Sequence, residues 1–146
     1  MKKLIFLLAA IVFLIGATAF NSNAQVSLKS PYSLTSDTVT NTGTAYLSTS
    51  YLQPSGAPTL IWVAVTKISG TVGGTISLQG SIDGTNWKAL NTPDSQTALA
   101  TITATDATNT YHWRLAHSHF TYYRVTWTGT GTMSASFTAK ILRSRL

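Results

Sequence analysis

The sequence predicts an all-β protein: a single antiparallel β-sandwich of about eight strands, jelly-roll or immunoglobulin-like, after an N-terminal hydrophobic segment. The chain beyond residue 25 is rich in threonine, whose branched Cβ suits a pleated, half-exposed surface, and it has no helical periodicity. Its short apolar stretches are separated by turn-forming Gly, Pro, Asn and Asp at the spacing typical of a sandwich or barrel.

The N-terminal segment has the pattern of a secretory signal peptide. Two lysines precede a long apolar run, and Ser22 and Ala24 occupy the small-residue positions of a cleavage site before Gln25. A second such site would cut before Phe20. The alternative is an uncleaved membrane anchor, although the run is slightly short for a span of about 20 residues. We expect residues 1–24 to be the signal, with membrane contact only if they are retained.

Residues 25–146 are then expected to form one exported domain, either extracellular, at the cell surface or in the periplasm. The chain has no cysteine, which excludes disulfides, thiol chemistry and a lipid-modified N-terminal cysteine. Its formal net charge of +6 is scattered thinly along the sequence and accompanies no nucleic-acid-binding motif. We therefore expect no nucleic-acid partner and no cofactor.

Nine segments have strand character, of which the first is the weakest. They are residues 34–40, 44–51, 59–68, 75–82, 87–90, 98–104, 111–115, 121–128 and 133–142. The segment 59–65 is apolar on both faces, which predicts a central strand or one covered by another subunit. The segment 133–142 alternates cleanly, so one face of that strand is expected in the core and the other in solvent.

Residues 77–90 predict a hairpin. Asp83-Gly84 supplies the positive-φ positions of a tight turn between two alternating strands. This role explains Asp83 without catalysis. We interpret Trp87, just beyond the bend, as a side chain that fills the core next to the small Gly80.

Enzymatic activity is not expected. A glycosidase needs two facing carboxylates. The chain has no glutamate and four aspartates: Asp37, Asp83, Asp94 and Asp106. Each aspartate is at a position where turn formation or backbone hydrogen bonding is the usual role. The serine-nucleophile motif Gly-x-Ser-x-Gly is also absent. His117 and His119 are weak candidates for metal ligands, because two imidazoles without a third ligand do not make a zinc site.

The densest mixture of aromatic and basic side chains lies between residues 111 and 124. Rings beside cations are typical of sugar-binding or protein-binding surfaces. The candidate recognition residues are Tyr111, Trp113, Arg114 and Tyr122, and the alternative for each is packing.

Two motifs, GSIDGTNW at residues 80–87 and YYRVTWTGTG at residues 122–131, carry a resemblance to known families. They resemble small β-sandwich structural proteins of tailed bacteriophages, such as decoration, fibre and tail components, and more loosely discoidin-like carbohydrate-binding domains. The resemblance implies a fold and transfers no binding residue.

We therefore expect a non-enzymatic structural or interaction protein that assembles with itself or with a larger particle, either a virion or a cell surface. The alternative is a carbohydrate-binding, discoidin-like module that holds a surface glycan through Tyr111, Trp113 and Tyr122. A small hydrolase is the least favoured reading.

Overall fold

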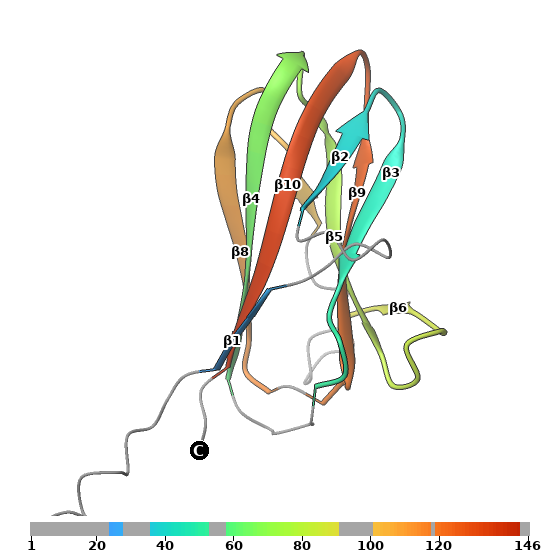
Figure 1. The fold of residues 1–146 in the computed structure, drawn as a ribbon, viewed down its shortest axis with the longest axis vertical. Helices are drawn as coiled ribbons and strands as arrows, with labels where there is room; N and C mark the ends of the chain where they lie inside the picture. The colour runs from blue at the N-terminus through green and yellow to red at the C-terminus, as the bar shows by residue number, and fades with distance from the viewer. Residues whose placement is uncertain (1–23, 28–35, 53–57, 91–100, 118, 144–146) are drawn as a thin grey trace, which may run out of the picture.

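The computed structural model describes residues 24–27, 36–52, 58–90, 101–117 and 119–143. These residues form strands only, in two sheets of five strands packed face to face (Figure 1). The strands are β1 (Ala24–Ser27), β2 (Ser36–Thr40), β3 (Thr44–Ser48), β4 (Thr59–Gly70), β5 (Gly74–Ser81), β6 (Lys88–Ala89), β7 (Ile102–Thr103), β8 (Asn109–Leu115), β9 (Tyr122–Gly129) and β10 (Met133–Arg143). No helix long and apolar enough to cross a membrane occurs in this part of the chain.

The first sheet, sheet A, has the order β8, β4, β10, and both β1 and β2 pair with the far edge of β10. The second, sheet B, has the order β3, β9, β5, and both β6 and β7 pair with the far edge of β5. Every pairing is antiparallel. The all-β sandwich predicted from the sequence is thereby confirmed.

The connections identify a jelly roll and not an immunoglobulin-like fold. Most successive strands lie in opposite sheets: β2 then β3, β3 then β4, β4 then β5, β8 then β9, and β9 then β10. The sheet orders β2-β10-β4-β8 and β3-β9-β5-β7 are those of a double-sheet jelly roll. Immunoglobulin-like sheets instead contain hairpins of consecutive strands.

The core lies between the sheets and is made by alternate residues of the long strands. Trp127 on β9 packs edge-on against Phe137 on β10, with 5.6 Å between ring centroids. Its indole Nε1 donates a hydrogen bond to the carbonyl oxygen of Gly73 at 3.2 Å, so the one polar atom of this buried ring has a partner. The predicted alternation of the last strand is confirmed, because Phe137, Ala139 and Ile141 are all fully buried.

β4 lies between β10 and β8, as its two apolar faces predict. Its inward residues Ile61, Val63 and Val65 are fully buried, whereas Leu60 and Trp62 are half-buried on the outer face of sheet A. A central strand has neighbours on both sides, so even its outward side chains lose part of their contact with water.

The hairpin at residues 77–90 differs from its prediction. β5 and β6 pair through Gln79 with Ala89, and the six residues 82–87 form a wider loop in place of a two-residue turn. Gly84 has a φ of 75°, but Asp83 does not have a positive φ. The Asp83 carboxylate organises the loop instead, since Oδ1 accepts hydrogen bonds from the amides of Thr85 and Asn86, each at 2.8 Å.

Other boundaries also differ. β1 was not predicted, and the segment 98–104 is reduced to β7, with residues 98–100 outside the described chain. The predicted signal at residues 1–24 lies almost wholly outside it as well, as does Asp94.

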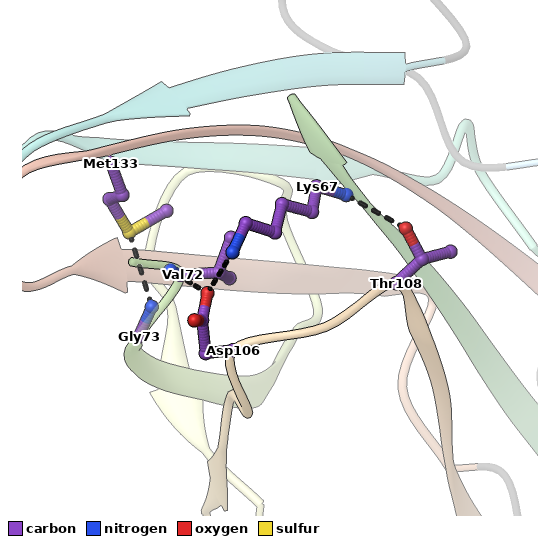
Figure 2. Close-up of polar contacts among 6 residues, drawn as sticks. All are labelled: Lys67, Val72, Gly73, Asp106, Thr108 and Met133. Atoms are coloured by element: carbon purple, nitrogen blue, oxygen red, sulfur yellow. Dashed lines mark hydrogen bonds and ion pairs between the residues drawn. The ribbon is translucent and has the colours of Figure 1, made fainter. Parts of the chain in front are cut away.

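One carboxylate ties three segments together at the end of the sandwich where β4 turns into β5 (Figure 2). Asp106, in the loop between β7 and β8, accepts from Lys67 Nζ and from the Val72 amide, both at 2.7 Å. The amide of Lys67 donates to Thr108 Oγ1 at 3.1 Å. Asp106 therefore has the backbone-bonding role that its threonine-rich context predicts.

Candidate ligand-binding surface

The outer face of sheet A carries side chains in cross-strand rows. In one row, Trp62 on β4 lies opposite His112 on β8 and Lys140 on β10. In the next, Leu60 lies opposite Arg114 and Leu142 on the same two flanking strands. Side chains directly opposite each other in a sheet are close enough to touch one common ligand. The register thus brings together residues that are far apart in the sequence.

This face is hollowed. A groove of about 920 Å³ is bordered by Leu60, Trp62, His112, Arg114 and Leu142. A smaller hollow of about 240 Å³ adjoins it over Leu60, Trp62, Lys140 and Leu142. The larger volume lies within the range of about 300 to 1,000 Å³ that is usual for ligand sites. We call these six residues the sheet A face.

The sheet A face combines an apolar floor with basic sides. Leu60, Trp62 and Leu142 lie in both hollows, and Leu142 is 37% exposed although it is a large aliphatic residue. Lys140 Nζ lies 5.9 Å from the centroid of the Trp62 ring. Of the described residues that line the two hollows, none is acidic. The surface can therefore stack a flat ligand on Trp62 while its rim provides hydrogen-bond donors.

The structure places the recognition residues predicted from the sequence in different parts of the molecule. Trp113 points into the core and is 6% exposed, opposite Ile61, so it offers no ring face to a ligand. Tyr111 also faces inward, and its phenol oxygen accepts a hydrogen bond from the Thr105 amide at 2.9 Å. Arg114 is exposed on the sheet A face.

Tyr122 lies in the other sheet. It is half-buried at the start of β9, and its ring meets that of Tyr51 edge-on with 5.8 Å between centroids. Arg114 is thus the single predicted residue that belongs to the groove.

The two candidate metal ligands lie near each other, with 5.7 Å between the ring centroids of His117 and His119. Within the described residues, no group of three or more His, Cys, Asp or Glu side chains is placed to hold a metal ion.

The prediction for Trp87 was wrong. Its ring is half-buried on the outer face of sheet B, where the guanidinium of Arg124 lies 4.5 Å from its centroid and 5.0 Å from that of Tyr46. Gln79 Oε1 accepts from Arg124 Nε at 2.8 Å. Burial lowers the pKa of Arg124, and Tyr46 partly offsets this. The space beside Gly80 is filled by other residues, since a Cβ there would lie 2.6 Å from the Phe120 ring.

Sequence reasoning did not include Trp62, His112 and Lys140 among the candidate binding residues. The signal for Trp62 was present, because a strand that is apolar on both faces puts some apolar side chains on the outside of its sheet. Alternation along each strand indicates that His112 and Lys140 face solvent, but only the register of β8 and β10 against β4 brings them to Trp62.

Comparison with known proteins supports the fold. A cleaved adhesin domain of Lys-gingipain from Porphyromonas gingivalis superposes with a TM-score of 0.51 at 11% identity, covering 86% of this chain and 99% of that domain. The CBM22-1 and GH10 modules of a Clostridium thermocellum endo-1,4-β-D-xylanase, in complex with xylohexaose, give 0.48 at 13% identity, with 86% of this chain and 25% of that chain covered.

A family 29 carbohydrate-binding module from Piromyces equi gives a TM-score of 0.47 at 11% identity, with 84% of this chain and 91% of that module covered. Of the xylanase chain, this chain spans about a quarter of the length. No protein-family model matches the sequence. No curated protein matches it either. The likeness to the adhesin domain is one of fold.

Proposed function

We propose that this protein is an exported, non-enzymatic binding module that holds a glycan on the sheet A face. The observation that carries the proposal is the position of Trp62, at the floor of an open groove with His112 and Lys140 opposite it on the flanking strands. Sugar rings have apolar faces that stack on an indole and hydroxyls that need polar partners around it. The predicted signal segment supports export.

The discoidin-like resemblance fits this proposal, although through other residues than those expected. Trp62 takes the place proposed from the sequence for Trp113, whose ring is covered in the core. Arg114 is retained from the predicted set, because it lies at the side of the groove.

Assembly with a second copy or with a larger particle is the second candidate, and the phage-protein resemblance fits it. It is favoured by the apolar floor, since Leu60, Trp62 and Leu142 would be covered by a partner protein. Lys140 argues against it, because the centre of a protein interface is depleted in lysine.

The test is calorimetric titration of the purified protein with a panel of neutral and charged polysaccharides. We expect at least one to bind, and Trp62→Ala to weaken that binding by at least about tenfold, or about 1.4 kcal/mol. The matched control is Tyr51→Ala, because Tyr51 is 62% exposed and its ring contacts Tyr122 of sheet B. Thermal unfolding of each variant checks that it is folded.

No binding to any polysaccharide, or equal binding by wild type and Trp62→Ala, would refute the proposal. A dimer or larger species in light scattering that becomes monomeric in Trp62→Ala would instead support the assembly function.

A further inference from the structure

We infer that the ligand of the sheet A face is an anionic polysaccharide, a linear glycan that carries carboxylate or sulfate groups. This inference rests on the proposed glycan-binding function and adds the chemical class of the ligand. It is drawn from the charges around Trp62.

The first observation is that the cations of the sheet A face are uncompensated. In the described part of the chain, the one ion pair joins Lys67 and Asp106, away from the groove. Lys140 and Arg114 therefore have no carboxylate partner among these residues. Opposite charge on a ligand would complete the surface, and charge complementarity is a main source of specificity in binding.

The second observation is where the cations lie. Arg114 is on β8 and Lys140 is on β10, with β4 between them, so their backbones are two strand spacings apart, or about 10 Å. Trp62 lies between the two strands. A sugar stacked on its ring would have positive charge on both sides. A chain with anionic groups at intervals can meet both cations while one of its rings stacks on Trp62.

The third observation concerns Lys140. Its Nζ lies 5.9 Å from the centre of the Trp62 ring, which is near the outer limit for a cation–π contact. A contact this long is weak at an exposed site, so the ammonium group is free to move to an anion at the rim. His112 adds a donor nitrogen in either protonation state.

The experiment compares polygalacturonate, dextran sulfate and neutral dextran of similar length, in titrations at about 0.05 M and 0.5 M salt. We expect the two anionic polymers to bind at low salt at least about tenfold more tightly than dextran. We expect this difference to shrink at high salt, because exposed charges are screened. The ratio of the dissociation constants of polygalacturonate and dextran sulfate shows whether the surface prefers carboxylate or sulfate groups.

Lys140→Gln and Arg114→Gln should each weaken anionic binding about three- to tenfold at low salt, and should weaken the binding of dextran by a smaller factor, because dextran has no charge for the cation to meet. Lys88→Gln is the matched control, because it removes the same charge from an exposed site in sheet B and should change nothing. Each of these side chains is exposed, so the variants are expected to fold.

Neutral dextran that binds as tightly as the anionic polymers, with no effect of Lys140→Gln, would overturn this inference and leave glycan binding intact. No binding to any of these polymers or to the wider panel would overturn both. Single-stranded DNA or vesicles of anionic lipid that bind more tightly than the anionic glycans, with the same sensitivity to Lys140→Gln, would also overturn it.

Discussion

Lys67 on β4 and Asp106 in the loop before β8 form an ion pair, with 2.7 Å between Nζ and Oδ1. The same Oδ1 accepts the amide hydrogen of Val72 in the turn between β4 and β5, so one carboxylate joins β4, that turn and the loop before β8 (Figure 2). The hydrogen bond from Lys67, followed by that from Val72, lowers the pKa of Asp106.

Asp106 should therefore make stability depend on acid pH. A carboxyl group whose folded pKa is below its unfolded value of about 3.9 stabilises the fold above that value, and this contribution is lost as pH falls through the folded pKa. We expect Asp106→Asn to lower Tm at pH 7. The difference in Tm between the variant and the wild type should become smaller below about pH 4. Melting curves across pH 2 to 7 measure both effects, and Asp37→Asn is the control. A gap that stays constant with pH would contradict the assignment.

The pair of Trp127 and Phe137 should dominate the core energetically. Phe137 is 1% exposed, and replacing it with alanine leaves a cavity against the Trp127 ring. We expect Phe137→Ala to cost about 3 to 5 kcal/mol, a large part of the roughly 5 to 15 kcal/mol that stabilises a domain. Urea unfolding measures the loss. Thr138→Ala, on the outer face of the same strand, should stay within about 0.5 kcal/mol.

Gly74 and Gly131 should differ sharply in their tolerance of a side chain. Gly74 has a φ of 112°, and a Cβ there would lie 2.1 Å from the carbonyl oxygen of Thr128 on the paired strand. Gly131 has a φ of 73° with nothing within 4 Å of its Cβ position. We expect Gly131→Ala to cost about 1 to 2 kcal/mol and Gly74→Ala to cost more than about 3 kcal/mol. Chemical denaturation measures both losses. If Gly74→Ala and Gly131→Ala lower the free energy of unfolding equally, the backbone of β9 moves away from the new Cβ without strain.

Arg124 should not be replaceable by lysine. Its planar guanidinium lies between the rings of Trp87 and Tyr46 while Nε donates to Gln79, a geometry that an ammonium cannot reproduce. We expect Arg124→Lys to cost about 1 kcal/mol and to change the fluorescence of Trp87. A double-mutant cycle with Trp87→Ala isolates the pair, and we expect a coupling of about 0.5 to 2 kcal/mol. If the stability losses of Arg124→Lys and Trp87→Ala simply add in the double variant, the stacking of Arg124 on Trp87 is contradicted.

Periodicity along the chain predicted which face of the last strand, β10, is buried. The alternation around Phe137 was sufficient because one residue in two of that strand meets the opposite sheet. The absence of alternation in residues 59–65, which are apolar on both faces, predicted a central strand or one covered by another subunit, and β4 lies between β10 and β8. Neither required knowledge of the partner strands.

What the sequence could not predict depends on register between distant segments. Trp113 lies opposite Ile61 on the inner face of sheet A and Arg114 lies on the outer face, as the alternation of apolar and polar residues in this segment indicates. The alternation does not predict that Arg114 lies beside Leu60 of β4. Trp87 was misplaced because the stacking site for its ring is created by Arg124 and Tyr46, which belong to other strands. The groove on sheet A has the same origin in the pairing of β8 and β10 with β4.

The pairing of β1 with β10 has one more consequence. Ala24 lies opposite Arg143 in an antiparallel ladder, so these two strands form a hairpin that lacks only its turn (Figure 1). A short peptide joining them, with new ends opened at the turn around Gly131, would give a circular permutant with the same sheets. Such a molecule would carry its ends at the opposite end of the sandwich from Leu60 and Arg114, so that an immobilising tag could be attached there without crowding the groove.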